Sequence, residues 1–300
     1  MKIIDAHHHL WDLQKFPYSW LSPEAGPRPF GDHTKIKTNF LFEHYLEDIY
    51  SDVSMERVDL VASVLVQANV GVNDPIAEIE WLAEEASRVN RKVAIVGQAD
   101  IFSSDFENAL DNQMKTPQFR GVRIFCGWDE DLKWRQTDRQ DLLWSPEFCR
   151  AMELLEKRDL SLDLVVRPPQ LTELTSILKD MPNTNVVINH LATLHADNAD
   201  EHRIWRDGIA AIAEFPNVYM KISGLWSIDR GWNPAAIRPP LEHVIDHLGI
   251  GRCMFGSNFP VEKVMLPFPT MFTMLRESLT MTDENWESLF FVTPRDFYRL

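Results

Sequence analysis

The sequence predicts an α/β fold, a single-domain (β/α)8 TIM barrel that spans residues 1–300. Eight short runs rich in apolar and β-branched residues recur along the whole chain, and segments with helical periodicity separate many of them. The length of 300 residues also suits such a barrel, which typically needs about 250 residues. An open, doubly wound sheet is the alternative. That fold usually has a glycine-rich turn after its first strand, whereas histidines follow the first strand here.

The expected strands are near-continuous in Val, Ile, Leu, Ala and Met, which is typical of parallel strands covered on both faces. They are Lys2–His9, Leu60–Gln67, Lys92–Asp100, Arg120–Phe125, Ser161–Arg167, Asn185–His190, Asn217–Ser223 and Arg252–Ser257.

Helices are expected between these strands, at Pro75–Asn90, Ser104–Lys115, Pro146–Lys157, Gln170–Lys179 and His202–Glu214. Three of them have candidate N-caps, namely Asp74, Ser104 with Glu107 three residues later, and Ser145. Two long connections, 13–39 and 126–144, follow the first and fourth strands. Both therefore belong to the C-terminal face of the barrel, where enzymes of this fold carry their sites.

The composition limits the partners of the protein. A net charge of −15 and a pI near 5.1 argue against nucleic acid, since phosphate binding needs a basic face. The sequence lacks an apolar run of about 18 residues, so no membrane span is expected. The three cysteines, Cys126, Cys149 and Cys253, form no CxxC pair. That pattern suits a reducing compartment, and with no visible secretory signal it predicts a cytoplasmic protein. A homo-oligomer is compatible with the sequence.

The segment Asp5-Ala6-His7-His8-His9 is the most informative motif. Side chains two residues apart on a strand point to the same face, so Asp5, His7 and His9 are expected to share one. Two such imidazoles can converge on one divalent ion that keeps a coordination position open for water. A solvated histidine tract is the alternative. An expression tag is disfavoured, because apolar and acidic residues precede the cluster directly.

In a barrel, the ends of all eight strands meet at one mouth. His190 would then join His7 and His9 as a third imidazole, although taken alone it fits a hydrogen-bonded core histidine. The other polar residues at the expected strand ends are Gln67, Asp100, Arg123, Arg167, Lys221 and Asn258.

Several short motifs occur in order along the chain, namely Asp5-Ala6-His7-His8-His9-Leu10-Trp11, Gly121-Val122-Arg123, Asn189-His190-Leu191, Val218-Tyr219-Met220-Lys221-Ile222-Ser223-Gly224-Leu225 and Met254-Phe255-Gly256-Ser257-Asn258-Phe259-Pro260-Val261. With these motifs the chain resembles the amidohydrolase superfamily, and within it the group of fuconolactone, rhamnonolactone, sulfomuconolactone and pyrone-dicarboxylate lactonases. The resemblance implies a hydrolase that opens a small sugar-acid or aromatic-derived lactone. It makes His7, His9, His190 and Asn258 the candidate catalytic residues, with the three histidines as metal ligands.

Position 258 departs from the pattern of that group. There strand eight normally carries Gly-Ser-Asp-Trp-Pro, whose aspartate binds the metal or takes a proton from the attacking water. Asn258 has no negative charge and no basicity, although its carbonyl can orient a water. We therefore expect a zinc- or manganese-like divalent ion to be bound weakly, or the reaction to proceed without a metal. In that case a histidine is the base, and Arg123 or Lys221 stabilises the oxyanion.

The remaining mouth residues indicate the substrate. Arg123, Arg167 and Lys221 predict an anionic or carbonyl-bearing ring, because arginine forks match carboxylates. For each of these cations a salt bridge to a nearby acid is the alternative. Gln67, Trp11 and Trp226 are further candidates for substrate binding, since tryptophan-rich loops suit a flat ring. A lactone isomerase, a decarboxylase or other lyase, and a non-catalytic binding protein are the alternative functions.

Overall fold

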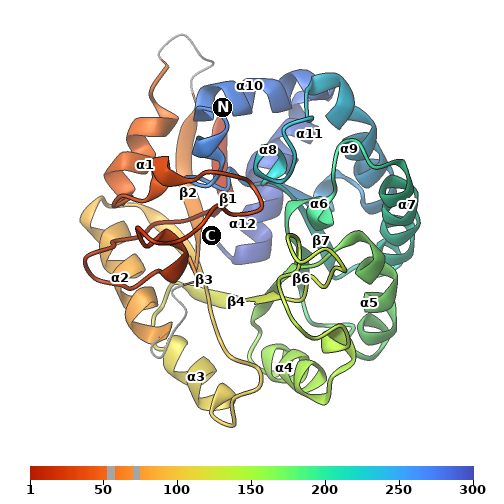
Figure 1. The fold of residues 1–300 in the computed structure, drawn as a ribbon, viewed down its shortest axis with the longest axis horizontal. Helices are drawn as coiled ribbons and strands as arrows, with labels where there is room; N and C mark the ends of the chain where they lie inside the picture. The colour runs from red at the N-terminus through yellow and green to blue at the C-terminus, as the bar shows by residue number, and fades with distance from the viewer. Residues whose placement is uncertain (53–57, 70–74) are drawn as a thin grey trace.

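The computed structural model describes residues 1–52, 58–69 and 75–300, and it confirms the predicted barrel. Within these residues, one sheet contains eight parallel strands in sequence order, surrounded by helices (Figure 1). The strands are β1 (Lys2–His8), β2 (Asp59–Val66), β3 (Lys92–Gly97), β4 (Phe119–Phe125), β5 (Ser161–Val165), β6 (Val186–Ile188), β7 (Val218–Ile222) and β8 (Cys253–Phe255).

The barrel closes between β8 and β1 at the mouth. The backbone amide of Asn258 donates to the His7 carbonyl at 2.7 Å, and the amide of His9 donates to the Phe259 carbonyl at 2.7 Å. These bonds place the histidine motif of β1 directly beside the residues that follow β8.

All eight predicted strands are present, but several end earlier than expected. β3 ends at Gly97 instead of Asp100, and β6 ends at Ile188 instead of His190. At the mouth the chain stops pairing with the neighbouring strands and forms turns, and the side chains there form hydrogen bonds with nearby residues of the same turn. Asp100, for example, accepts a hydrogen bond from the Phe102 amide at 2.9 Å.

The longer helices are α1 (Phe42–Ile49), α2 (Pro75–Arg88), α3 (Phe106–Gln113), α4 (Pro146–Lys157), α5 (Pro168–Asp180), α7 (Ala199–Ala213), α9 (Pro234–Leu248) and α10 (Phe268–Ser278). The shorter ones are α6 (His190–Thr193), α8 (Leu225–Ile228), α11 (Asp283–Glu287) and α12 (Thr293–Tyr298). None of the helices in the described ranges is long and apolar enough to cross a bilayer.

One predicted cap is confirmed and one is wrong. Ser145 Oγ accepts the Phe148 amide at 3.1 Å and caps α4. Ser104 does not cap α3, because that helix begins at Phe106, and its N-cap residue Asp105 makes no side-chain cap bond. The third candidate, Asp74, lies outside the described residues.

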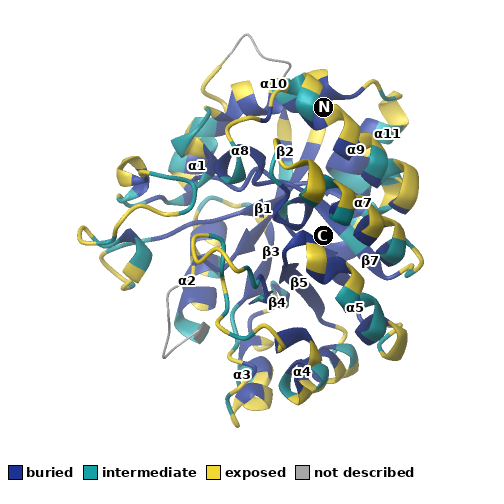
Figure 2. Cartoon of the chain, turned by 45° about the vertical axis from the view of Figure 1, so that its right-hand side comes forward, coloured by how far each residue is buried: buried dark blue, intermediate teal, exposed yellow. Residues whose placement is uncertain are grey.

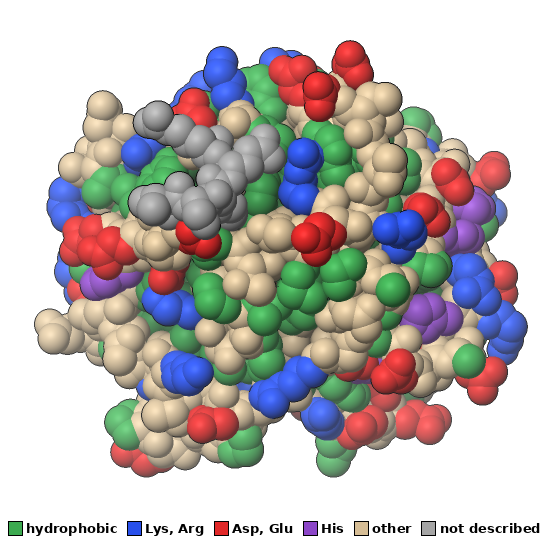
Figure 3. All heavy atoms as spheres, turned by 90° about the horizontal axis from the view of Figure 1, so that it is seen from above, with side chains coloured by type: hydrophobic (Ala, Val, Ile, Leu, Met, Phe, Trp, Pro, Cys, Tyr) green, Lys and Arg blue, Asp and Glu red, His purple; other side chains and the backbone are tan. Residues whose placement is uncertain are grey.

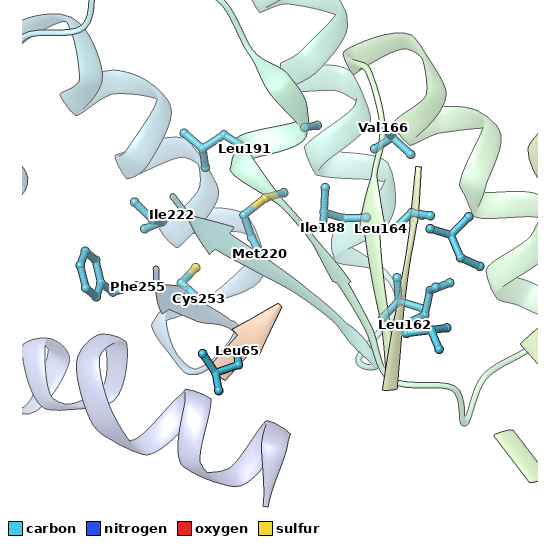
Figure 4. Packing of buried hydrophobic residues seen from close by; sticks show 14 of the residues in the cluster. Leu65, Leu162, Leu164, Val166, Ile188, Leu191, Met220, Ile222, Cys253 and Phe255 are labelled. Carbon is cyan, nitrogen blue, oxygen red and sulfur yellow. The ribbon is translucent and has the colours of Figure 1, made fainter. Parts of the chain in front are cut away.

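Two apolar layers hold the barrel together. The larger one fills the space between strands and helices, and Figure 4 shows Leu164, Ile188 and Met220 side by side from three neighbouring strands. The smaller layer lies inside the barrel and contains Val64 together with Phe297 of α12. In Figure 2 the strands are buried and the outer faces of the helices are exposed.

The barrel interior also holds a buried ion pair. Lys221 Nζ lies 2.5 Å from the Asp163 carboxylate, and both side chains are fully buried. The Tyr298 hydroxyl donates to the same carboxylate at 2.8 Å. On its other side, Lys221 Nζ is 3.4 Å from His7 Nδ1. A chain of contacts inside the barrel therefore connects Tyr298, through the ion pair of Asp163 and Lys221, to His7.

Candidate active site

A cavity of about 860 Å³ opens where the strands end. Four of the predicted site residues line it, His9, Arg123, His190 and Asn258. Parts of the two long connections form its outer walls, as do residues of α8. These four side chains therefore meet at the mouth of the barrel.

The structure brings the three imidazoles together. The ring centroids of His7 and His9 are 5.0 Å apart, and those of His7 and His190 are 4.6 Å apart. The Nε2 atoms of His7 and His9 are separated by 3.3 Å. His8 is held elsewhere, because its ring stacks on Tyr45 at 3.9 Å.

Hydrogen bonds fix the orientation of two of these rings. His9 Nδ1 lies 2.7 Å from the Val66 carbonyl oxygen, and His190 Nδ1 lies 2.8 Å from Ser223 Oγ. The Nε2 atoms are thereby left for a ligand or a water. Asp5 does not take part, since the Tyr45 hydroxyl donates to its carboxylate at 2.5 Å and the Ser257 amide at 2.8 Å.

His190 lies beyond the end of β6, in an unusual backbone conformation. Each residue of α6, His190–Thr193, has a positive φ between 50° and 58°. A left-handed conformation costs an L-residue roughly 1–2 kcal/mol, and such strain is concentrated at functional sites. This turn could not be predicted from the sequence, because none of its four residues is a glycine.

Burial sets the protonation of the three imidazoles. It lowers the pKa of His7 and His190 well below the ordinary value, with further contributions from Lys221 and Arg123. The pKa of His9 falls to about 3, through burial and then through the charge of Arg123. All three rings are therefore neutral near pH 7. Their lone pairs can bind a ligand, but as bases they are weak.

The donor set fits a divalent metal only in part. Two nitrogens on a tetrahedral zinc, at about 2.0–2.1 Å each, lie about 3.3 Å apart, which matches the Nε2 atoms of His7 and His9. However, no group of three or more His, Cys, Asp or Glu side chains among residues 1–52, 58–69 and 75–300 is arranged to hold a metal ion. Asn258 adds no charge, and Lys221 and Arg123 are nearby cations. These residues do not form a complete metal site.

Arg123 is a cation without a carboxylate partner. One of its guanidinium nitrogens donates to the Gln67 carbonyl at 2.6 Å, and the group lies over the Phe125 ring at 4.6 Å. Its Nε has no hydrogen-bond partner. Within the described residues, no acid lies at salt-bridge distance from it, and burial lowers its pKa to about 10. Arg123 therefore remains charged near pH 7 and available to an anionic ligand.

The predicted partners of Arg123 lie elsewhere. Arg167 forms salt bridges with Asp129 at 2.8 Å and Glu201 at 3.0 Å, and it lines an adjacent cavity of about 640 Å³ together with Trp226. Lys221 is paired with Asp163 below the histidines. Neither cation lines the larger cavity, so Arg123 and Arg167 do not form one carboxylate clamp.

Comparison with known proteins identifies the family. The family model described as "Amidohydrolase" matches residues 4–300. The chain belongs to the amidohydrolase family. It is 31% identical over 299 residues to the uncharacterized protein y4mH of Sinorhizobium fredii, covering 99% of this chain and 98% of that protein. It is 27% identical over 265 residues to an L-fucono-1,5-lactonase of Burkholderia ambifaria, covering 87% of this chain and 81% of the relative.

Solved structures share the fold of this amidohydrolase over its whole length. An amidohydrolase of Burkholderia multivorans, described with bound zinc, has a TM-score of 0.79 and 20% identity, with 100% of both chains covered. A probable 2-pyrone-4,6-dicarboxylic acid hydrolase of Acinetobacter baumannii, with citric acid bound, has a TM-score of 0.76 and 13% identity, again with 100% of both chains covered. At these identities the likeness concerns the fold.

The amidohydrolase cavity has further residues that the sequence did not single out. Arg28 comes from the first long connection, Lys133 and Arg135 come from the second, and Ser227 comes from α8. The two loops were predicted to border the mouth, but nothing in their sequence marked these side chains. Trp20 and Trp134, which belong to the tryptophan-rich loops predicted at the mouth, also line the cavity. Trp11 does not, since it is fully buried and its indole donates to the Thr38 carbonyl at 2.7 Å.

The cavity differs in charge from the rest of the molecule. Four of its described lining residues are basic, Arg28, Arg123, Lys133 and Arg135, and none of the described lining residues is acidic. The face of the molecule seen in Figure 3, by contrast, has acidic and basic side chains interspersed, and the whole chain has a net charge of −15. The cavity is therefore a local positive site on an acidic hydrolase.

Proposed function

We propose that this amidohydrolase hydrolyses a small lactone that carries at least one carboxylate. One observation carries the proposal, the cavity in which four basic side chains and no described acidic one surround the imidazoles. Charge of one sign in a cleft attracts and retains ligands of the opposite sign. The lactonase name of one relative supports the ring-opening reaction. The citric acid bound to a structural neighbour supports an anionic ligand.

In this proposal the residues that line the cavity have different roles in the reaction. His9, His190 and Asn258 hold the attacking water, and the guanidinium of Arg123, which has no carboxylate partner among the described residues, faces the lactone carbonyl. As water adds to the carbonyl carbon, negative charge develops on the carbonyl oxygen, and Arg123 stabilises it with a charge-assisted hydrogen bond. Arg28, Lys133 and Arg135 bind the carboxylate of the substrate. The ring C–O bond then breaks, and the product is a hydroxy acid.

A metal is optional in the proposed reaction. A zinc- or manganese-like ion would be held by His7 and His9, with His190 nearby, and would activate a bound water. The zinc described for one structural neighbour supports this assignment. The incomplete donor set of the described residues supports weak binding.

The test is hydrolysis of two lactones that differ in charge, the dianionic 2-pyrone-4,6-dicarboxylate and the neutral L-fucono-1,5-lactone. Each is assayed after chelation and after addition of Zn²⁺ or Mn²⁺, with mass analysis of the products. We expect ring opening with the higher kcat/KM on the dianion. Preference for the neutral sugar lactone would contradict the anionic class. Release of CO2, an isomerised lactone, or binding without turnover would favour the decarboxylase, isomerase or non-catalytic alternative, respectively.

A further inference from the structure

A buried carboxylate lies behind the wall of the cavity, four residues after Asn258. Glu262 is fully buried, and its backbone amide donates to the Asn258 carbonyl at 3.1 Å. The Ser227 hydroxyl donates to Glu262 Oε1 at 2.5 Å. The Ser227 backbone amide lies 3.1 and 3.2 Å from the two carboxylate oxygens. Nothing in the roles described above uses this carboxylate.

Ser227 connects this carboxylate to the cavity. It lines the larger cavity together with His9, His190 and Asn258, and the Asn258 amide nitrogen lies 3.4 Å from its Oγ. The hydroxyl thus has the cavity on one side and Glu262 on the other. Two acceptors lie within reach of its single hydrogen, Glu262 Oε1 at 2.5 Å and the Gly224 carbonyl oxygen at 3.0 Å, and the carboxylate is the nearer and more strongly accepting one. With the hydrogen on the carboxylate, an oxygen lone pair remains for a proton from the cavity.

We propose that, in the lactone hydrolysis proposed above, Ser227 accepts the proton of the attacking water while passing its own proton to Glu262. This inference rests on the proposed function. Ser227 is then the catalytic residue that touches the water, and Glu262 acts through it. The carboxylate that position 258 lacks is supplied from position 262.

The proton transfers balance in both halves of the reaction. The water oxygen bonds to the carbonyl carbon, one water O–H bond breaks, and that proton moves to Ser227 Oγ as the original hydroxyl proton moves to Glu262. The carbonyl π electrons move to the oxygen beside Arg123. When the intermediate collapses, the ring C–O bond breaks, and the proton returns through Ser227 to the leaving alkoxide. Glu262 ends as a carboxylate, as it began.

The environment of Glu262 suits this role. Burial raises its pKa to about 7, while hydrogen bonds from Ser227, from the Asn258 side chain and from the Trp226 backbone hold it lower than burial alone would. All three of these groups are uncharged. A base works best when its pKa lies near the working pH, whereas the pKa of His9 is about 3. The predicted histidine base is therefore the less suitable one.

If Glu262 has only a structural role, different effects are expected when Ser227 and Glu262 are substituted. Its carboxylate accepts amides at the start of α8 and so also caps that helix. The Ser227 backbone amide supports the cap without the hydroxyl, but the proton path needs the hydroxyl. Ser227→Ala therefore separates the two roles, and Glu262→Gln retains an oxygen that can accept the cap bonds.

The experiment measures kcat, KM and the pH profile of Ser227→Ala, Ser227→Thr and Glu262→Gln on 2-pyrone-4,6-dicarboxylate, or on L-fucono-1,5-lactone if the wild type prefers it. We expect Ser227→Ala and Glu262→Gln to lower kcat about a hundredfold to ten-thousandfold, with little change in KM and with loss of the limb near pH 7. Ser227→Thr retains a hydroxyl and should recover most of the rate. Ser278→Ala, at another buried serine, is the matched control. Unchanged kcat in Ser227→Ala would overturn the proposal.

A second measurement needs no substrate. Infrared difference titration of the wild type should show two buried carboxyls that protonate near pH 7, Glu78 and Glu262. Glu262→Gln should lack one of them, and the difference between the two titrations isolates Glu262. Ser227→Ala should move its midpoint upward, since the lost hydrogen bond stabilised the carboxylate. If neither lactone is hydrolysed but this titration is seen, the substrate class is wrong and the proton path stands. If wild type and Glu262→Gln titrate alike near pH 7, the path is wrong whatever the substrate.

Discussion

Arg123 is a basic residue of the cavity, and no acid among the described residues forms a salt bridge with it. We expect Arg123→Ala to lower kcat/KM about tenfold to a hundredfold, because a charge-assisted hydrogen bond contributes roughly 1.5–3 kcal/mol. The melting temperature should change little. Steady-state kinetics and thermal unfolding measure both effects.

Arg120, on the same strand, provides the control for Arg123. Its guanidinium donates to the Tyr298 carbonyl at 2.9 Å and so contributes to the floor of the barrel. Arg120→Ala should lower the melting temperature and leave kcat/KM nearly unchanged. The reverse pattern in the two variants would show that Arg123 has a structural role.

Glu78 is a second buried carboxyl whose pKa is raised to about 7, chiefly by burial. The pKa of Glu78 is higher in the folded state than in the unfolded state, where it is near 4.5. The free energy of unfolding is therefore greatest below pH 4.5 and falls as the pH rises to about 7. The fall amounts to roughly 3 kcal/mol. Glu78→Gln abolishes the titration and keeps an acceptor for Tyr18 and Ala68, which donate to Oε1 at 3.1 Å each.

Urea unfolding at pH 4.5 and at pH 8 tests this expectation. The free energy of unfolding of Glu78→Gln relative to wild type should increase between the two pH values. Glu80→Gln removes an exposed carboxylate from the same helix, α2, and its difference from wild type should not depend on pH. A common pH dependence for both variants would contradict the assignment to Glu78.

Asn258→Asp should not raise kcat/KM on either lactone. The new carboxyl would lie close to Glu262, with which the Asn258 side chain already interacts, and two carboxyls at such distance cannot both be ionised easily. Asn69→Asp, which places a carboxyl elsewhere on the cavity lining, controls for charge alone. Lactonase activity that appears only in Asn258→Asp would indicate a natural protein that has lost hydrolysis.

Among the elements, the turn between β7 and α8 positions the site most directly. Gly224 has a φ of 67°, and a Cβ added there would collide with His190 Nδ1. We expect Gly224→Ala to displace the imidazole and to lower kcat at least tenfold, because a misplaced catalytic group loses much of its effect.

The control for this turn is Gly249, which has a φ of 81° and no atom within 4 Å of an added Cβ. Gly249→Ala carries backbone strain without the collision, and at a φ of 81° and ψ of 149° this strain is at least as large as that at Gly224, which has a φ of 67° and ψ of 16°. It should reduce stability and leave kcat unchanged. Equal losses of kcat in both variants would mean that strain alone, and not contact with His190, explains the effect.

For the whole molecule, we expect the purified protein to contain less than one equivalent of divalent metal. The charge that normally helps to hold an ion at position 258 is absent, and the nearby cations oppose binding. Elemental analysis before and after prolonged chelation, with parallel assays, measures this. One full equivalent that survives chelation would show that the imidazoles alone bind tightly.

Much of the fold could be predicted because it depends on neighbours in the sequence. Apolar runs and helical periodicity determined the eight strands and most helices. The spacing of His7 and His9 on one strand determined their pairing. The C-terminal limits of the strands could not be predicted, since the turns that end them, such as the left-handed one at His190, are stabilised by contacts from other strands.

The sequence by itself determined the barrel, the imidazole cluster and the loss of the carboxylate at position 258, because each is fixed by local pattern or residue type. Only the tertiary structure decided which charges face the cavity. Arg167 and Lys221 are neutralised by acids from distant segments, Arg123 is not, and Ser227 meets a carboxylate 35 positions later. Such pairings depend on which loops and strands pack together in space, and no short stretch of sequence specifies that.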